Sequence, residues 1–161
     1  MKKSGFTMIE LIFVIVVLGI LAAVALPKFQ KVGEQAHVGN LKSFTGTLNG
    51  TVGPSVWSKA VTENEGNISK QLSDDGETLA DLTDIPKEIK KSDLKKCDDP
   101  NKIKMIAIGD EAVNGAKYAI GCAGGNGVKS PAFYLYKTAK TATAHNLGDV
   151  NNSDDTLIFP K

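Results

Sequence analysis

The hydrophobic positions of this chain begin with one long uninterrupted block. Residues Phe6 to Leu26 are almost entirely apolar, and Glu10 is the single charge among them. A helix of this length spans about 31 Å, close to the thickness of a bilayer's hydrocarbon core. The pattern therefore predicts a membrane-spanning helix.

A periodic pattern follows Pro27. Apolar residues recur mostly three to five positions apart, at Phe29, Val32, Ala36, Leu41, Phe44 and Leu48. This spacing predicts an amphipathic helix to near Gly50 with one buried stripe. Pro27 lacks a backbone donor and is expected to kink or loosen the helix near residues 23–27, and Pro54 is expected to end or bend it.

The C-terminal half alternates in the manner of strands. Candidate strands lie in KIKMIAIG, AKYAIGCAGG and PAFYLYKT, and DTLIFP is expected to be a short edge strand stopped by Pro160. Between helix and strands, DDGETLADL predicts a short helix capped by Asp74 or Asp75, and the charged run at residues 86–96 is interpreted as a solvated surface. Three or four antiparallel strands on the helix's stripe make an α+β head.

Composition argues against an enzyme. The 19 basic residues, all lysine, nearly balance 18 acidic residues, so no net field favours nucleic acid. Lysine lacks the planar fork of arginine that clamps phosphate or carboxylate. Two cysteines are too few for a zinc cage, and only the two histidines, His37 and His145, could help them. We expect no catalysis by this chain.

Two ordinary interpretations fit the first 26 residues. Lys2 and Lys3 place the start of the chain in the cytoplasm and the remainder outside. A secretory signal peptide could be cleaved after Ala25, at the A-x-A pattern of residues 23–25, releasing a soluble binding protein that begins at Leu26. An uncleaved anchor also fits. Both leave Glu10 unexplained, although a charge in the bilayer costs about 2.5–3.5 kcal/mol.

Cleavage between Gly5 and Phe6 explains Glu10. It would free an α-amino group on Phe6 that is largely charged at neutral pH. Side chains of a helix lean toward its N-terminus, so Glu10 would point back toward the first turn and its positive dipole end. The carboxylate could then pair with the new cation of its own chain or of a neighbouring one.

The segment KKSGFTMIELIFVIVVLGILAAVALP resembles the N-terminus of type IV pilins and type II secretion pseudopilins. The shared elements are a short basic leader, Gly5, Phe6, Thr7 and Glu10 before the apolar stretch. The resemblance covers about thirty residues. It implies a leader of residues 1–5, a membrane and filament-core helix of residues 6–26, and a head of residues 27–161. It also implies cleavage after Gly5, N-methylation of Phe6, and contact of Glu10 with a neighbour's Phe6 amine.

The resemblance further implies a function and its partners. The chain would be a structural subunit of a type IV pilus-like filament for adhesion, motility or DNA uptake; the alternative is a type II secretion pseudopilin. Its partners would be copies of itself, a prepilin peptidase, an inner-membrane platform with its ATPase, and minor pilins. The precursor would cross the bacterial inner membrane once, and the assembled form would be a surface pilus or a periplasmic pseudopilus. The helix near Pro27 is expected to melt when the filament forms.

Two further predictions concern the head. Cys97 and Cys122 lie on the exported side, where disulfides persist, and a bridge between them would contribute about 3 kcal/mol. The usual pilin bridge encloses the last stretch of the chain, so an adhesive role of that loop does not carry over. Hard oxygen ligands at alternating positions form a candidate calcium loop, although it lacks the glycine and glutamate of an EF-hand: Asp149, Asn151, Ser153 and Asp155. No specific nucleic-acid site is predicted, because the lysines are interspersed with acidic residues.

Overall fold

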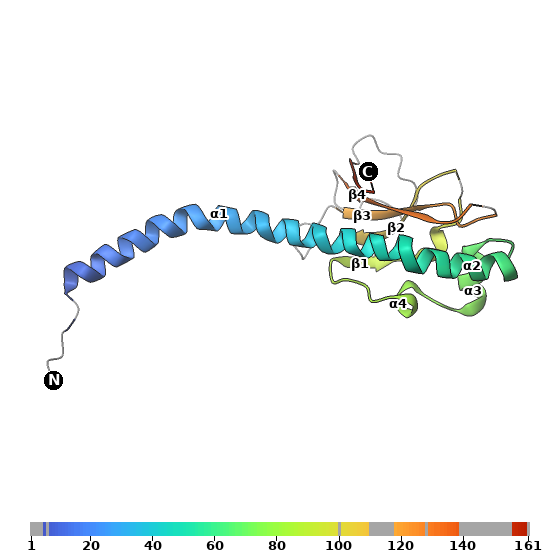
Figure 1. Cartoon of the computed structure of the whole chain (residues 1–161), viewed down its shortest axis with the longest axis horizontal. Helices are drawn as coiled ribbons and strands as arrows, with labels where there is room; N and C mark the ends of the chain where they lie inside the picture. Colours follow the sequence, from blue (N-terminus) through green and yellow to red (C-terminus); the bar gives the residue numbers. More distant parts are fainter. Residues whose placement is uncertain are drawn as a thin grey trace. The chain divides into compact units, whose positions relative to one another are not determined.

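The computed structural model describes Gly5 and residues 7–99, 101–109, 118–127, 129–138 and 156–160. A long helical segment comes first in the chain and a β-sheet follows (Figure 1). The chain divides into two compact units, Met1–His37 and Val38–Lys161. The first helix, α1 (Met8–Thr47), contributes to both units.

In the first unit, the large apolar side chains of α1 are exposed from Met8 to Leu26. Phe29 and Val32 are also exposed, by 71% and 58%. The predicted buried stripe is therefore wrong for these two residues and for Ala36, which is also exposed. All three belong to the unit that ends at His37, and the buried part of the stripe starts at Leu41, in the second unit.

Helix α1 meets the requirement for a membrane span by length and composition. It is apolar around its whole circumference up to Leu26, which is typical of a helix that is covered by lipid or by other helices. The helix continues through Pro27. Melting of this region in a filament stays a prediction.

The helical segment extends beyond its predicted end. After α1, the chain makes a π-helical turn, η1 (Leu48–Val52), and continues as α2 (Gly53–Glu63). The expectation that the helix ends near Gly50 is wrong. Pro54 cannot donate a backbone hydrogen bond, and its ring would clash with the preceding turn of a regular helix. The wider π turn, in which the Gly53 N–H donates to the Leu48 carbonyl, takes up this irregularity and lets the helix go on.

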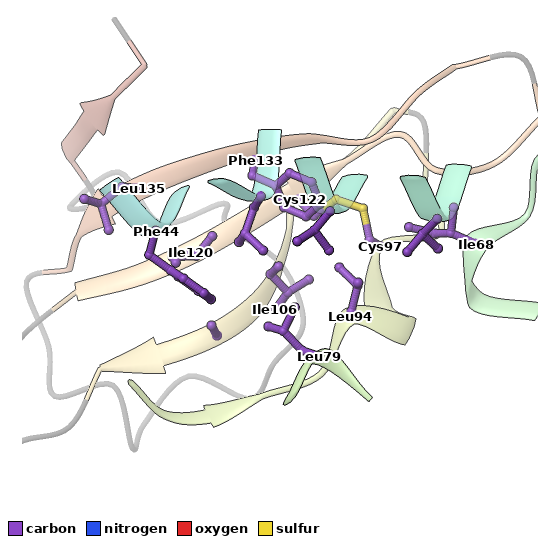
Figure 2. Packing of buried hydrophobic residues seen from close by; sticks show 14 of the residues in the cluster. Phe44, Ile68, Leu79, Leu94, Cys97, Ile106, Ile120, Cys122, Phe133 and Leu135 are labelled. Atoms are coloured by element: carbon purple, nitrogen blue, oxygen red, sulfur yellow. A yellow bond between two sulfur atoms is a disulfide. The ribbon is translucent and has the colours of Figure 1, made fainter. Parts of the chain in front are cut away.

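The second unit is built on the buried face of this helical segment. The buried side chains follow one another three or four positions apart: Leu41, Phe44, Leu48, Val52, Val56 and Ala60. They pack with Ile106, Ile120, Phe133 and Leu135 of the sheet in one hydrophobic core (Figure 2). The second half of the predicted stripe is confirmed.

The sheet has five antiparallel strands in the order β1-β2-β3-β4-β5. The strands are β1 (Ile89–Ser92), β2 (Lys104–Gly109), β3 (Tyr118–Ala123), β4 (Ala132–Lys137) and β5 (Thr156–Phe159). A long N-terminal helix followed by an antiparallel sheet confirms the predicted α+β fold. The edge strand expected before Pro160 is β5.

One local prediction in the connecting region is confirmed and one is wrong. The charged run at residues 86–96 is exposed at Lys87, Lys90 and Lys91, as predicted, and it also contains strand β1 and the short 3-10 helix η2 (Leu94–Lys96), which were not predicted. The predicted cap of the short helix is misplaced. Helix α3 (Ile68–Asp75) includes both candidate caps, and α4 (Leu79–Leu82) is capped by Thr78, whose hydroxyl donates to Asp81 at 2.6 Å. This hydrogen bond and that of the Thr78 N–H lower the pKa of Asp81.

Candidate assembly site

The carboxylate of Glu10 closes the first turn of α1. The Thr7 N–H donates to Glu10 Oε2 at 2.8 Å, and the Thr7 hydroxyl donates to the same oxygen at 2.7 Å. In return, Thr7 Oγ1 accepts from the Glu10 N–H at 3.4 Å. Thr7 and Glu10 thus form a reciprocal capping pair, which satisfies two of the donors left open at a helix start.

This geometry fixes where the charge lies. Both hydrogen bonds from Thr7 reach Oε2, and a carboxylate has acceptor capacity on both of its oxygens. The carboxylate is held at the N-terminal end of the helix, where the helix dipole favours a negative charge. Gly5 is exposed. Phe6, the predicted methylation site, lies outside the described residues.

The surroundings of Glu10 are apolar. Its neighbours Ile9, Leu11 and Phe13 are exposed by 76%, 55% and 69%. A single carboxylate therefore lies at the edge of a helix surface that water solvates poorly. An apolar surface of this kind is stable only when lipid or another helix covers it. The charge of Glu10 restricts the positions that a covering helix can take.

The two cysteines form a disulfide in the head. Cys97 follows η2 and Cys122 lies on β3, with 5.3 Å between their Cα atoms. Both are buried in the hydrophobic core (Figure 2). The bridge ties the connecting region to the centre of the sheet.

The predicted calcium ligands Asp149, Asn151, Ser153 and Asp155 lie outside the described residues, and the calcium site stays a prediction. Within the part of the chain that the structure describes, no three His, Cys, Asp or Glu residues are grouped to hold a metal ion.

Sequence analysis named Thr7 as part of the motif but did not predict that it pairs with Glu10, although the T-x-x-E spacing of a capping box is visible in the sequence. It missed Asn49 altogether. Its Nδ2 donates to the Phe133 carbonyl at 2.8 Å, and its Oδ1 accepts from the Phe133 N–H at 2.9 Å. No local signal marks this contact, because 84 residues separate the partners.

Comparison with known proteins places the N-terminal segment. Residues 1–26 match the family model described as the prokaryotic N-terminal methylation motif. By this segment, the chain is similar to type IV pilus and fimbrial proteins. The matched residues include Gly5, Phe6 and Glu10.

Individual relatives match over the same region. The type IV narrow pilus major component PilA5 of Thermus thermophilus is 49% identical over 41 residues, which are 26% of this chain and 35% of that protein. The type IV major fimbrial protein FimA of Dichelobacter nodosus is 41% identical over 46 residues, which are 29% of this chain and 30% of that protein. The chain therefore matches about a third of the length of these relatives. No solved structure matches the chain.

Proposed function

We propose that this chain is a subunit of a type IV pilus-like filament. It is made as a membrane precursor, cleaved after Gly5 by a prepilin peptidase and methylated on Phe6. The observation that carries the proposal is the capped carboxylate of Glu10 at the start of an apolar helix whose large side chains are exposed. The named relatives, which are major subunits of a pilus and of fimbriae, favour a pilus over a secretion pseudopilus.

The exposed apolar helix must be kept out of water, and this requirement favours assembly. Burying one large apolar side chain contributes about 1.5–3 kcal/mol relative to water, so the helix is covered at every stage. The inner membrane covers it in the precursor, with the N-terminus in the cytoplasm, and the helices of neighbouring copies cover it in the filament. Transfer from lipid to filament gives little hydrophobic gain, because lipid is as apolar as the side chains. Close packing and polar contacts decide the assembled arrangement.

Glu10 determines which arrangement of the packed helices is favoured. A carboxylate in an apolar filament core is costly unless it is paired. The Phe6 amine of a neighbouring copy is the cation that cleavage creates, and Glu10 can accept from it while Thr7 still occupies Oε2. The pairing fixes the axial position of each copy. The proposed partners in assembly are an inner-membrane platform with its ATPase, and minor pilins.

Two substitutions of Glu10 separate charge from helix capping. Glu10→Gln keeps an oxygen that can accept from the Thr7 N–H and hydroxyl, but it removes the charge. Glu10→Ala removes both. We expect both variants to be cleaved after Gly5 and to give at least about tenfold less sheared filament than the wild type, a loss equivalent to about 1.4 kcal/mol per added subunit. Filament protein and total mature protein are measured by immunoblot of the sheared and membrane fractions.

The outcome for Glu10→Gln is decisive. If it assembles like the wild type while Glu10→Ala fails, capping of the helix is what matters and the charge pairing is wrong. Met8→Leu is the matched control in the same turn, because it preserves an exposed apolar side chain and touches neither Thr7 nor Glu10 in the described contacts. It should assemble normally.

A further inference from the structure

The head carries its charges in two consecutive blocks. Residues 71–86 contain five acidic residues and no lysine, and residues 87–96 contain five lysines and two acidic residues. The first block covers the end of α3 and all of α4, and the second covers β1 and η2. Random mixing of a nearly neutral composition would intersperse the two signs. The two signs of charge are therefore separated along this part of the chain.

Some of these charged side chains already form hydrogen bonds or ion pairs within the head. In the acidic block, Asp75 accepts from Lys59 Nζ at 2.7 Å, which lowers the pKa of Asp75. Asp81 caps α4. The remaining acidic side chains of the block, Asp74, Glu77 and Asp84, define what we call the acidic surface; Asp74 and Asp84 are exposed and Glu77 is half-buried.

The lysine block is more strongly positive at its surface than its sequence indicates. Glu88 is buried, with 1% of its surface exposed, and accepts from Asn40 Nδ2 at 3.0 Å. Asp93 accepts from the Lys95 N–H at 3.2 Å. Three lysines remain exposed on or just before the edge strand β1, and we call them the lysine edge: Lys87, Lys90 and Lys91. Glu88 is thus turned to an internal contact, whereas Asp93 caps η2 and stays half-exposed.

We propose that the acidic surface of one copy binds the lysine edge of a neighbouring copy in the filament. This proposal rests on the proposed function. The two surfaces are different, so each copy offers one to each of two neighbours, and such a contact propagates along a polymer instead of closing a pair. Opposite charges brought together between heads also fix the relative rotation of the copies, because like charges repel in other arrangements.

The lysine edge also protects the sheet. An edge strand has unpaired backbone groups, and lysines along it prevent pairing with the edge of another sheet. That role requires positive charge on β1 only and places no demand on the acidic surface. An exchange of charges between the two surfaces therefore distinguishes the two roles.

The test compares full-length precursors made in cells that carry out processing and assembly. One variant reverses the lysine edge with Lys90→Glu and Lys91→Glu. A second reverses the acidic surface with Asp74→Lys and Asp84→Lys. A third combines all four substitutions and restores the net charge. The matched control for the lysine reversal is Lys42→Glu with Lys102→Glu, which makes the same net change at two exposed lysines outside both surfaces.

We expect each reversal to reduce sheared filament about fivefold or more relative to mature protein in the membrane. The combined variant should recover at least half of the wild-type amount, and the control should stay within twofold of it. Raising the salt concentration to about 1 M, where the Debye length is about 3 Å, should weaken wild-type filaments and reduce their difference from each reversal variant, because salt screens both attraction and repulsion. Formation of the Cys97–Cys122 disulfide in each variant, measured by mass, shows that the head has folded. If the lysine reversal variant fails to accumulate, Lys90→Gln with Lys91→Gln replaces it, and we expect about twofold less sheared filament from that variant.

Failures of the two proposals look different. If the wild type assembles and both reversal variants give the same amount of sheared filament as the wild type, the contact between heads is wrong. It is also wrong if both reversal variants lose filament and the combined variant does not recover it. Absence of any sheared or membrane-bound filament from the wild type overturns the proposed function itself.

Discussion

Asn49 joins the long helical segment to the sheet through a single side chain. Its amide both donates to and accepts from the backbone of Phe133, and it also donates to the Thr45 carbonyl at 3.1 Å. Strand β5 pairs with β4 only between Leu135 and Lys137. At Phe133 the amide of Asn49 therefore takes the place of a neighbouring strand.

Replacing Asn49 should destabilise the head. Asn49→Ala leaves the N–H and the carbonyl of a partly buried backbone position without partners, so the free energy of unfolding should fall by about 1–3 kcal/mol. Denaturant unfolding of the detergent-solubilised chain, followed by circular dichroism, measures this change. Thr47→Ala is the matched control, because Thr47 is exposed and its hydroxyl bonds only to Ser43 in the described contacts. An effect of Asn49→Ala no larger than that of the control would contradict the bridging role.

At the scale of elements, the junction of η1 and α2 is where the helix adapts to Pro54. Gly53 is buried there because β4 passes close to it. A Cβ at Gly53 would lie 2.7 Å from Phe133 Cε2 and 2.9 Å from the Leu48 carbonyl oxygen. The second of these atoms is backbone and accepts the π-type hydrogen bond, so it cannot move freely.

Gly53→Ala should consequently cost about 1–3 kcal/mol of stability through overpacking. Gly50→Ala, three residues earlier, is the control, since nothing lies within 4 Å of its added Cβ. That substitution should be neutral or stabilise the helix by about 0.5–1 kcal/mol. Thermal unfolding of both variants under identical conditions measures the difference. Equal stability of the two variants would show that the close approach of β4 to Gly53 is wrong.

The same elements show how far the sequence predicts the fold. The spacing of Leu41, Phe44 and Leu48 predicts the buried face, because a stripe on one helix depends on local periodicity alone. The path through Pro54 depends on a change of hydrogen-bond register that no local rule fixes. Strand β1 was missed for a similar reason, since Lys90 and Lys91 are compatible with a strand only at the edge of a sheet.

At the scale of the whole molecule, the chain combines two units with different requirements. Residues up to His37 expose an apolar helix, and the head from Val38 has a closed core with a disulfide. The assembly site was predictable from sequence because its elements lie within six residues, from Gly5 to Glu10. The contact of Asn49 with Phe133 depends on the folded head, and sequence alone did not reveal it. The two blocks of charge are visible in the sequence, but which of their side chains are exposed depends on the fold.

The central claim is that the chain is processed at Gly5 and enters a filament by its apolar helix. The most direct measurement is the intact mass and N-terminal sequence of the protein in membrane and sheared surface fractions. The account predicts a chain that begins at an N-methylated Phe6, carries one disulfide, and is present in the sheared fraction. Recovery from the membrane alone would favour a pseudopilus. A chain that begins at Leu26 would contradict the account, because it would have lost Glu10 and the apolar helix.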